Sequence, residues 1–344
     1  MTSKKWIYAL EELGQDHFAL VGRKCANLGE MTRLGMRVPS GFAISVDGFE
    51  TYMRETGLGS RIKAYFETQG DDLKKSIQRQ MDAGRVVQEM FATTPLPASI
   101  ADAIAIDYEA LCARFGESDL PVAVRSSGAV SMPGQMETYL HVRGSADVTR
   151  RVVEVWKSTF NTRAIAFRLE RGIPVDTAPI GVAVIRMVNA KCAGVVLTVI
   201  PTTGDMEHAV IEGNWGLGEA VVSGDITPDS FIVNKATLAI ERNVSRKAKW
   251  VVPTGNGTAK ADVPLHLQEL PCLADPEIHE LVRIAVNVEK HYGVPQDMEW
   301  VVDRDLPFPE NVIWVQTRAA KFTPQRKNAD AEYIMDQMVS LFRR

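Results

Sequence analysis

The sequence is poor in cysteine, and its cysteines have no spacing typical of a metal site. Its 344 residues include four cysteines, Cys25, Cys112, Cys192 and Cys272, and no CxxC pair. Scattered thiols of this kind predict neither a zinc site nor a disulfide framework. They are typical of proteins that stay reduced in the cytoplasm, which is where we expect this chain to be.

Long hydrophobic runs and a surplus of positive charge are also missing. The most apolar stretch, near residues 180–200, is interrupted by Arg186 and Lys191, so it falls short of the roughly 18 residues of a membrane span. The N-terminal segment MTSKKWIYALEELG lacks the apolar core of a signal peptide. The net charge is −4. We therefore expect no membrane insertion and no nucleic-acid partner.

Internal repeats, low-complexity segments and the phosphate-loop pattern GxxxxGK[ST] are absent as well. A nucleotide site in this chain would therefore not be a P-loop. The composition, 45% hydrophobic and 24% charged, is that of a globular protein. From the patterning we expect an N-terminal α/β lobe over 1–178, a sheet-rich lobe over 179–322, and a linker with a terminal helix over 323–344.

The most informative segment is DMEWVVDRDLPFPENVIWVQTR, residues 297–318. Two alternating runs, 297–303 and 312–318, flank a loop rich in Pro, Asp and Asn, which predicts a β-hairpin. Side chains two apart share a face of a strand, so Asp297 and Glu299 lie together. Gln316 and Arg318 do the same on the second strand.

A symmetric register pairs Asp303 with Val312, and it then places Glu299 opposite Gln316 and Asp297 opposite Arg318. Carboxylate and amide oxygens suit Mg²⁺, and a guanidinium suits phosphate. The alternative for such a hairpin is a surface ladder of charged pairs.

Two further segments suit phosphate binding. Residues 18–22 read as a strand, followed by a loop and a helix over 23–35, so Lys24 stands beside a helix N-terminus that can hold an anion. The alternative is a solvated lysine in a turn. The buried strand 122–124 delivers Arg125 to a loop of small and hydroxyl residues, 126–138, whose backbone can approach phosphate oxygens closely. The alternative there is a β-turn with an exposed arginine.

Taken together, four segments resemble the ATP-binding half of the phosphoenolpyruvate synthase and pyruvate phosphate dikinase family. They are GRKCANLGEM, VAVRSSGAVSMPGQMET, NWGLGEAVVSG with TPDSF, and DMEW followed by WVQTR. The likeness covers about residues 15–320. It implies an α/β (α+β) fold of the ATP-grasp type with two lobes, and ATP and Mg²⁺ as cofactors.

The resemblance also implies roles for single residues. Lys24 and Arg125 would bind phosphate and Arg318 would stabilise charge on the transferring phosphoryl group, which makes these three the catalytic candidates. Glu299 and Gln316 would bind Mg²⁺. The other nucleotide contacts would come from Thr138 in the small-residue loop, the adenine hinge Arg186, Met187 and Val188, Glu212, and Asp297.

Two features depart from the family pattern. Arg23 stands where the family usually has a second glycine before the lysine. The family's phosphorylated histidine lies in a characteristic sequence segment, and none of the six histidines of this chain lies in such a segment. The resemblance therefore implies a large partner subunit that carries this histidine and the acceptor site.

A separate ATP half of this size resembles the nucleotide-binding subunit of phenylphosphate synthase. It would transfer the pyrophosphoryl group of ATP to the partner's histidine, for phosphorylation of phenol or a substituted phenol with release of AMP and phosphate. The alternatives are the ATP half of a split phosphoenolpyruvate synthase or antibiotic phosphotransferase, a nucleotide-sensing subunit without turnover, and a fragment of a longer enzyme.

Overall fold

A computed structural model describes residues 5–129 and 136–322 of the chain. The expected linker and terminal helix over 323–344, and the middle of the small-residue loop 126–138, lie outside the described residues. Within residues 5–129 and 136–322, no helix combines the length and the hydropathy that crossing a lipid bilayer requires.

The described chain divides into two compact units. The first contains the residues up to Val188 together with Pro253–Ala259, and the second contains Asn189–Val252 and the residues from Lys260 onward. Each unit has its own sheet and its own helices, so the fold is of the expected mixed α+β class with two lobes. The division falls after residue 188, whereas the sequence suggested residue 178.

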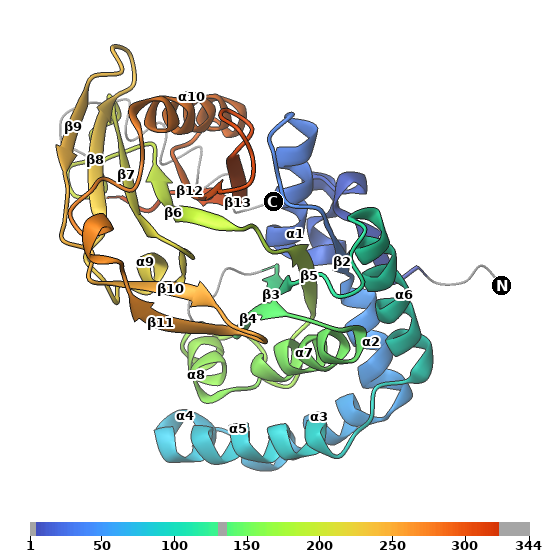
Figure 1. The fold of residues 1–344 in the computed structure, drawn as a ribbon. Helices are drawn as coiled ribbons and strands as arrows, with labels where there is room; N and C mark the ends of the chain where they lie inside the picture. Colours follow the sequence, from blue (N-terminus) through green and yellow to red (C-terminus); the bar gives the residue numbers. More distant parts are fainter. Residues whose placement is uncertain (1–4, 130–135, 323–344) are drawn as a thin grey trace. The chain divides into compact units, whose positions relative to one another are not determined.

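The first unit is built on an antiparallel sheet with the strand order β1-β2-β5-β3-β4 (Figure 1). Its strands are β1 (Ile7–Ala9), β2 (Gly41–Ile44), β3 (Val122–Gly128), β4 (Thr138–Val142) and β5 (Ile180–Arg186). Its α-helices are α1 (Phe18–Arg33), α2 (Val46–Glu55), α3 (Leu58–Gln69), α4 (Asp72–Lys75), α5 (Ile77–Ala92), α6 (Ala98–Arg114), α7 (Ser145–Ser158) and α8 (Thr162–Glu170). Strand β5 pairs with β2 on one side and β3 on the other, which explains why it belongs to this unit and not to the second.

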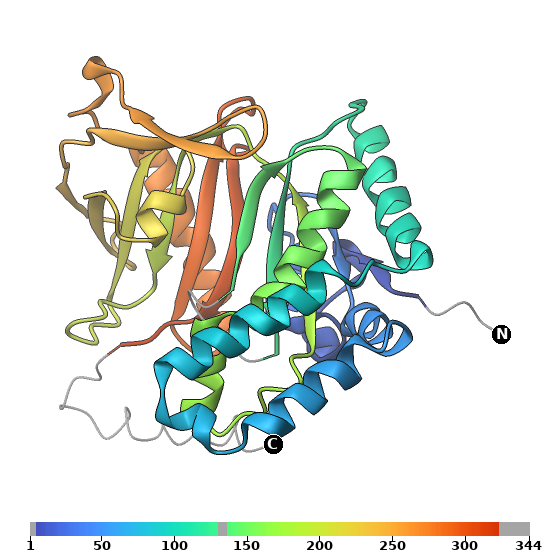
Figure 2. The same ribbon diagram turned by 90° about the horizontal axis from the view of Figure 1, so that it is seen from below.

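One face of this sheet forms the hydrophobic core with a layer of helices, which can be followed in Figure 2. Val122, Val124, Val182 and Val184 are fully buried in that core, alternating along β3 and β5 as period-two strands require. Each such side chain contributes roughly 1.5–3 kcal/mol relative to an exposed one. The core therefore fixes which side chains of β3 face the other way, and Arg125 is one of them.

Helix α1 packs on the opposite face of β3 and β5. That face carries small residues, including Ala123, Ser127 and Gly181, so the helix backbone can come close. A Cβ on Gly181 would lie 2.4 Å from the carbonyl oxygen of Val21. This close approach places the start of α1 directly against the end of β3.

The second unit is built on an antiparallel sheet with the order β13-β12-β6-β7-β8-β9. Its strands are β6 (Ala190–Leu197), β7 (His208–Trp215), β8 (Asp229–Asn234), β9 (Ile240–Asn243), β12 (Gln296–Asp303) and β13 (Val312–Ala319). Its α-helices are α9 (Glu219–Val222) and α10 (Asp275–Tyr292). A separate two-stranded sheet of β10 (Lys249–Pro253) and β11 (Thr258–Asp262) belongs to this unit except for its turn end, Pro253–Ala259, which belongs to the first unit. Three short 3-10 helices, Leu10–Glu12, Gln15–His17 and Leu265–Leu267, complete the described elements of both units.

The six-stranded sheet has two different faces. Helix α10 packs on one of them (Figure 1), where Met298, Trp300 and Val302 of β12 are buried; we call this the helix face. The opposite face carries Asp297 and Glu299, because side chains alternate along a strand. We call it the carboxylate face, and it carries the candidate site of this unit.

Candidate functional site

The hairpin β12–β13 has the register that the sequence predicted at its functional end. Glu299 lies opposite Gln316, and Asp297 lies opposite Arg318. The Gln316 Nε2 donates a hydrogen bond to Glu299 Oε1 at 2.8 Å. The Arg318 Nε donates a hydrogen bond to Asp297 Oδ2 at 2.8 Å, and a terminal guanidinium nitrogen forms an ion pair with the same oxygen at 2.7 Å. Four predicted site residues therefore lie together on the carboxylate face.

The expected pairing of Asp303 with Val312 is wrong, because the partner of Val312 is Val302. The register shifts by one residue between Glu299 and Trp300, where a β-bulge leaves Val315 as the extra residue on β13. Without the bulge, Trp314 and Gln316 would share a face. With it, Trp314 is buried on the helix face while Gln316 still points toward Glu299.

A row of directly opposed residues extends the site across the sheet. Glu299 lies opposite Val195 of β6, which lies opposite Glu212 of β7. Opposed residues share a face, so Glu212 is on the carboxylate face, two strand spacings or about 10 Å from Glu299. The next row runs from Asp297 through Leu197 to Val210. Carboxylates thus flank a strip of half-buried aliphatic side chains.

This arrangement suits a nucleotide better than it suits a free metal ion. The aliphatic strip of Val195, Leu197 and Val210 can support an apolar ring, and the flanking carboxylates can bind hydroxyl groups or a cation. Among residues 5–129 and 136–322, no three or more His, Cys, Asp or Glu side chains gather closely enough to enclose a metal. Glu299 and Gln316 instead supply two oxygen donors, which fits Mg²⁺ that takes its remaining ligands from phosphates and water.

The predicted phosphate-binding residues of the first unit form a second group, around a kink in α1. Residues 18–21 are helical, not a strand, and the helix restarts after Gly22, whose φ is +77°. A Cβ on Gly22 would lie 1.8 Å from the carbonyl oxygen of Ser127. The Ser127 Oγ accepts a hydrogen bond from the Cys25 N–H at 3.0 Å and so caps the restarted helix. Lys24 therefore does stand in the first turn of a helix.

Arg125 and Lys24 lie on the same side of the first sheet. Burial raises the pKa of the Cys25 thiol to about 12, and the positive charges of Lys24 and Arg125 act in the opposite direction. Both cations therefore lie close enough to Cys25 to lower the pKa of its thiol. Thr138 lies directly opposite Arg125 on β4 and is exposed. Lys24, Arg125 and Thr138 together make a cationic, hydroxyl-bearing surface that can bind phosphate oxygens.

We expect Gly22→Ala to destabilise the first unit by about 2–5 kcal/mol, because it combines a left-handed backbone with a steric clash. Gly35→Ala is the matched control. Gly35 has a φ of +73°, but a Cβ added there would have no atom within 4 Å, so this change should cost only about 1 kcal/mol. Urea unfolding of both variants measures the difference, and equal losses would show that the approach of Gly22 to Ser127 is not tight.

Only part of the predicted adenine hinge has backbone groups that remain available to bind adenine. The Arg186 N–H donates to the Ser40 carbonyl at 2.8 Å, and the Met187 N–H donates to the Pro121 carbonyl at 2.9 Å. The Arg186 guanidinium lies over the Phe115 ring, 4.3 Å from its centre. These two N–H groups are therefore already used, and the hinge prediction narrows to the backbone of Val188 and to the carbonyl groups of the segment.

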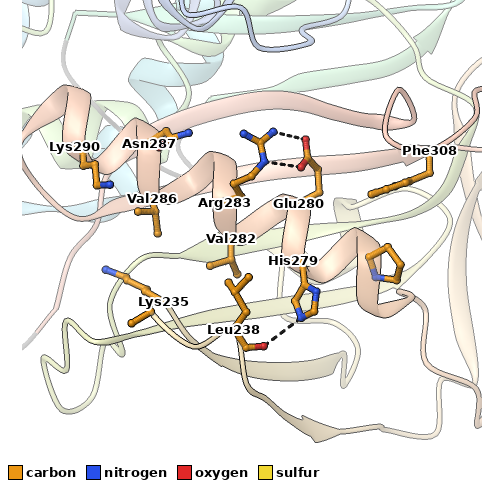
Figure 3. Close-up of a pocket in the computed structure, with 12 residues that line it drawn as sticks. Lys235, Leu238, His279, Glu280, Val282, Arg283, Val286, Asn287, Lys290 and Phe308 are labelled. Atoms are coloured by element: carbon orange, nitrogen blue, oxygen red, sulfur yellow. Dashed lines mark hydrogen bonds and ion pairs between the residues drawn. The ribbon is translucent and has the colours of Figure 1, made fainter.

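A hollow of about 470 Å³ lies elsewhere in the second unit, along the outside of α10 (Figure 3). Three of its polar side chains form an ion pair or lie within hydrogen-bond distance of a backbone carbonyl. Arg283 pairs with Glu280 at 2.7 Å, and His279 Nε2 lies 3.1 Å from the Leu238 carbonyl oxygen. None of the predicted site residues is part of its lining, so the hollow does not enter the site assignment.

Sequence reasoning missed two contributors that the structure shows. Ser127 was part of the small-residue motif, yet its capping bond to Cys25 depends on a contact between residues 102 apart in the chain. Arg23, at the position where the family resemblance led us to expect a glycine, donates from Nε to the Ala129 carbonyl at 2.7 Å. This departure from the expected glycine was the available signal, and the hydrogen bond connects the kink of α1 to the end of β3.

Comparison with known proteins identifies the family to which the chain is similar. Residues 18–338 match the family model described as the pyruvate phosphate dikinase AMP/ATP-binding domain. The chain is 36% identical over 359 residues to a probable phosphoenolpyruvate synthase of Staphylothermus marinus, covering 95% of this chain and 42% of that protein. It is 38% identical over 310 residues to a probable phosphoenolpyruvate synthase of Methanothermobacter thermautotrophicus, covering 88% and 45%.

A phosphoenolpyruvate synthase of Aeropyrum pernix is 34% identical over 361 residues, covering 96% of this chain and 44% of that protein. The chain thus spans less than half the length of these curated relatives. The family model, in contrast, matches nearly the whole chain. The chain therefore belongs to the pyruvate phosphate dikinase AMP/ATP-binding domain family.

Proposed function

We propose that this chain is the ATP-binding, phosphoryl-donating part of a dikinase-type phosphotransferase. The observation that carries the proposal is the hairpin register, which gathers Asp297, Glu299, Gln316 and Arg318 on one face beside an aliphatic strip. An ATP-binding family and an Mg²⁺-type donor pair support the same conclusion. We place the protein in the cytoplasm, where ATP is abundant.

In this proposal each group has a defined task. Lys24 and Arg125 bind phosphate oxygens, with Thr138 as a hydroxyl donor, and the Val188 backbone with Glu212 contacts the nucleoside. Glu299 and Gln316 would hold Mg²⁺, and the charge of the metal would offset the negative charge of the phosphates. Arg318 stabilises charge on the group in transit. Positioning and charge stabilisation suffice for phosphoryl transfer, so this chain needs no general base.

The proposed chemistry begins with attack by a histidine nitrogen of a partner polypeptide on the β-phosphorus of ATP. The bond to the α-phosphate oxygen breaks, AMP leaves, and the histidine carries a pyrophosphoryl group. Water then releases the γ-phosphate as inorganic phosphate. The remaining phosphoryl group passes to the acceptor hydroxyl, which we propose to be that of phenol or a substituted phenol.

Pyruvate is the second candidate for the acceptor. The observation that favours it is the name of the relatives above, phosphoenolpyruvate synthase, which they share across three organisms. In this case the same ATP chemistry would serve the enol oxygen of pyruvate. The residues of the ATP site would not differ between the two acceptors.

Labelled ATP distinguishes these possibilities. The chain, with Mg²⁺ and ATP labelled at the β-phosphate, is incubated with and without the polypeptide that supplies the histidine. Acid-labile label on that polypeptide that chases into phenylphosphate supports the first acceptor, and label that chases only with pyruvate supports the second. Tight ATP binding without any transferred label would instead identify a nucleotide sensor.

We expect Glu299→Gln to weaken the affinity for ATP in Mg²⁺ by about 10–100-fold, since it removes a charged metal ligand but keeps the side-chain shape. Titration calorimetry measures the dissociation constant. Chelating Mg²⁺ from the wild-type protein should lower its affinity to the level of the variant. Glu241→Gln, an exposed carboxylate on β9 of the same sheet, is the control and should bind normally. Unchanged binding by Glu299→Gln would remove Glu299 from the metal site.

A further inference from the structure

A buried polar network lies on the helix face directly behind the paired site residues. The Thr317 Oγ1 donates to Gln296 Oε1 at 2.9 Å. The Gln296 N–H donates to Thr198 Oγ1 at 2.9 Å, and the Thr198 N–H donates to the Gln296 carbonyl at 2.9 Å. The three residues are at most 2% exposed. The network joins β13 and β12 to the residue that follows β6.

This network occupies positions adjacent in sequence to the site residues. Gln296 precedes Asp297, and Thr317 stands between Gln316 and Arg318. Because neighbouring residues on a strand point to opposite faces, a bond between Gln296 and Thr317 on one face fixes the relative position of Asp297 and Arg318 on the other. Gln296 Nε2 also donates to the Val294 carbonyl at 2.9 Å, so its amide orientation is set.

The β-bulge makes such a lock necessary. Val315 is an extra residue on β13, and the strand has one register before it and another after it. Trp300 and Trp314 are buried on the helix face and fix the register only beyond the bulge. A slip of one residue on the other side would turn Gln316 and Arg318 toward the helix face. The Gln296–Thr317 bond is a side-chain contact on that functional side of the bulge.

We propose that Gln296 and Thr317 are positioning residues that hold Gln316 and Arg318 in register with Glu299 and Asp297. A buried hydroxyl and a buried amide have a strong directional requirement, since leaving either one without its partner is costly. Apolar side chains at these positions would fill the same space but would accept either register. The functional meaning of the lock rests on the function proposed above, whereas its structural effect does not.

The test is Thr317→Val, which keeps the shape and removes the donor. The first readout needs no nucleotide: it is the solvent exchange of the Arg318 Nε–H, which Asp297 accepts in the native register. We expect this exchange to become at least about tenfold faster, because the population that breaks this hydrogen bond rises. The second readout is affinity for ATP in Mg²⁺, expected to fall by a similar factor.

Two controls separate positioning from general stability. Thr317→Ser keeps a donor and should restore both readouts. Val233→Ala removes methyl groups from the buried core of β8 in the same sheet, and should lower stability without changing the Arg318 exchange. If Thr317→Val does not fold, Thr317→Ala replaces it.

Unchanged Arg318 exchange in a folded Thr317 variant would overturn the proposal. Faster exchange in a protein whose wild type binds no ATP would uphold the register lock and reject the proposed function. Faster exchange in Val233→Ala as well would reduce the network to an ordinary contribution to stability.

Discussion

Arg318→Ala is expected to lower the rate of phosphoryl transfer from ATP by about 10³–10⁵-fold, the range in which a charge-stabilising arginine acts in phosphoryl transfer. ATP binding should change little, because the guanidinium acts mainly on charge that develops in the transition state. The variant should therefore lose turnover while nucleotide still protects it against unfolding.

The ion pair between Arg318 and Asp297 affects the ATP affinity expected of the Arg318→Ala variant. In the native hairpin, both Arg318 contacts go to a single oxygen, Asp297 Oδ2. Removing the guanidinium leaves that carboxylate uncompensated on the face that would receive a polyanion, so we expect any small loss of ATP affinity in Arg318→Ala to come from this repulsion. Asp297→Asn combined with Arg318→Ala removes the repulsion, and it should bind ATP at least as well as the single variant but still fail to transfer.

Transfer is measured as label from β-labelled ATP on the histidine of the complementary polypeptide, at saturating ATP. Arg242→Ala is a suitable control, because Arg242 also forms an ion pair, with Asp275 at 2.6 Å, in the same unit but on β9. Its transfer rate should match the wild type. Normal turnover by Arg318→Ala would show that the catalytic assignment is wrong, and loss of turnover by both variants would point to a general effect of charge.

The β12–β13 hairpin shows how much of a strand register can be predicted from the local sequence pattern. Period-two alternation assigned the faces, and an assumed symmetric register then placed Glu299 opposite Gln316 and Asp297 opposite Arg318, as the structure has them. The bulge was not predictable in the same way, because it serves the burial of Trp300 and Trp314 against a helix that the hairpin sequence does not contain. The error was confined to the far side of the bulge, so the functional pairs were unaffected.

The start of α1 shows the opposite situation. Residues 18–21 combine an aromatic with aliphatic residues before a glycine, a pattern that suits a strand as well as a helix. The choice is made by tertiary contacts: the Val21 carbonyl approaches Gly181, and Gly22 approaches Ser127. The sequence nevertheless predicted Lys24 at a helix N-terminus correctly. That prediction depended on Gly22 and on the helix that follows Gly22, and not on the conformation of residues 18–21.

The neighbours of Glu299 across the sheet could not be read from local spacing at all. Glu212 shares a face with Glu299 only because β6 stands between β12 and β7 and pairs with both. That strand order brings residues from distant parts of the chain into one row. The resemblance to a family had suggested Glu212, and the register now gives it a physical position.

The largest expected loss of stability is at a fully buried ion pair in the second unit. Lys247 Nζ lies 2.6 Å from Asp229 Oδ1, and both side chains are 0% exposed. Asp229 also accepts hydrogen bonds from the N–H groups of Ser245 at 2.9 Å and Cys272 at 2.8 Å. Lys247→Met leaves this carboxylate buried without its cation, and we expect a loss of about 3–5 kcal/mol in the free energy of unfolding.

Urea unfolding of the second unit, followed by the fluorescence of its buried tryptophans, measures this loss. Lys249→Met is the matched control, because its ion pair with Asp262 is largely exposed, with side chains 55% and 81% accessible; it should cost less than about 1 kcal/mol. Asp229→Asn added to Lys247→Met should recover part of the loss, since a neutral amide costs less to bury than an unpaired carboxylate. A loss for Lys247→Met no larger than that of Lys249→Met would mean that water reaches Asp229 once the lysine is gone. In that case the ion pair with Lys247 would not explain why the TPDSF motif has an aspartate at position 229.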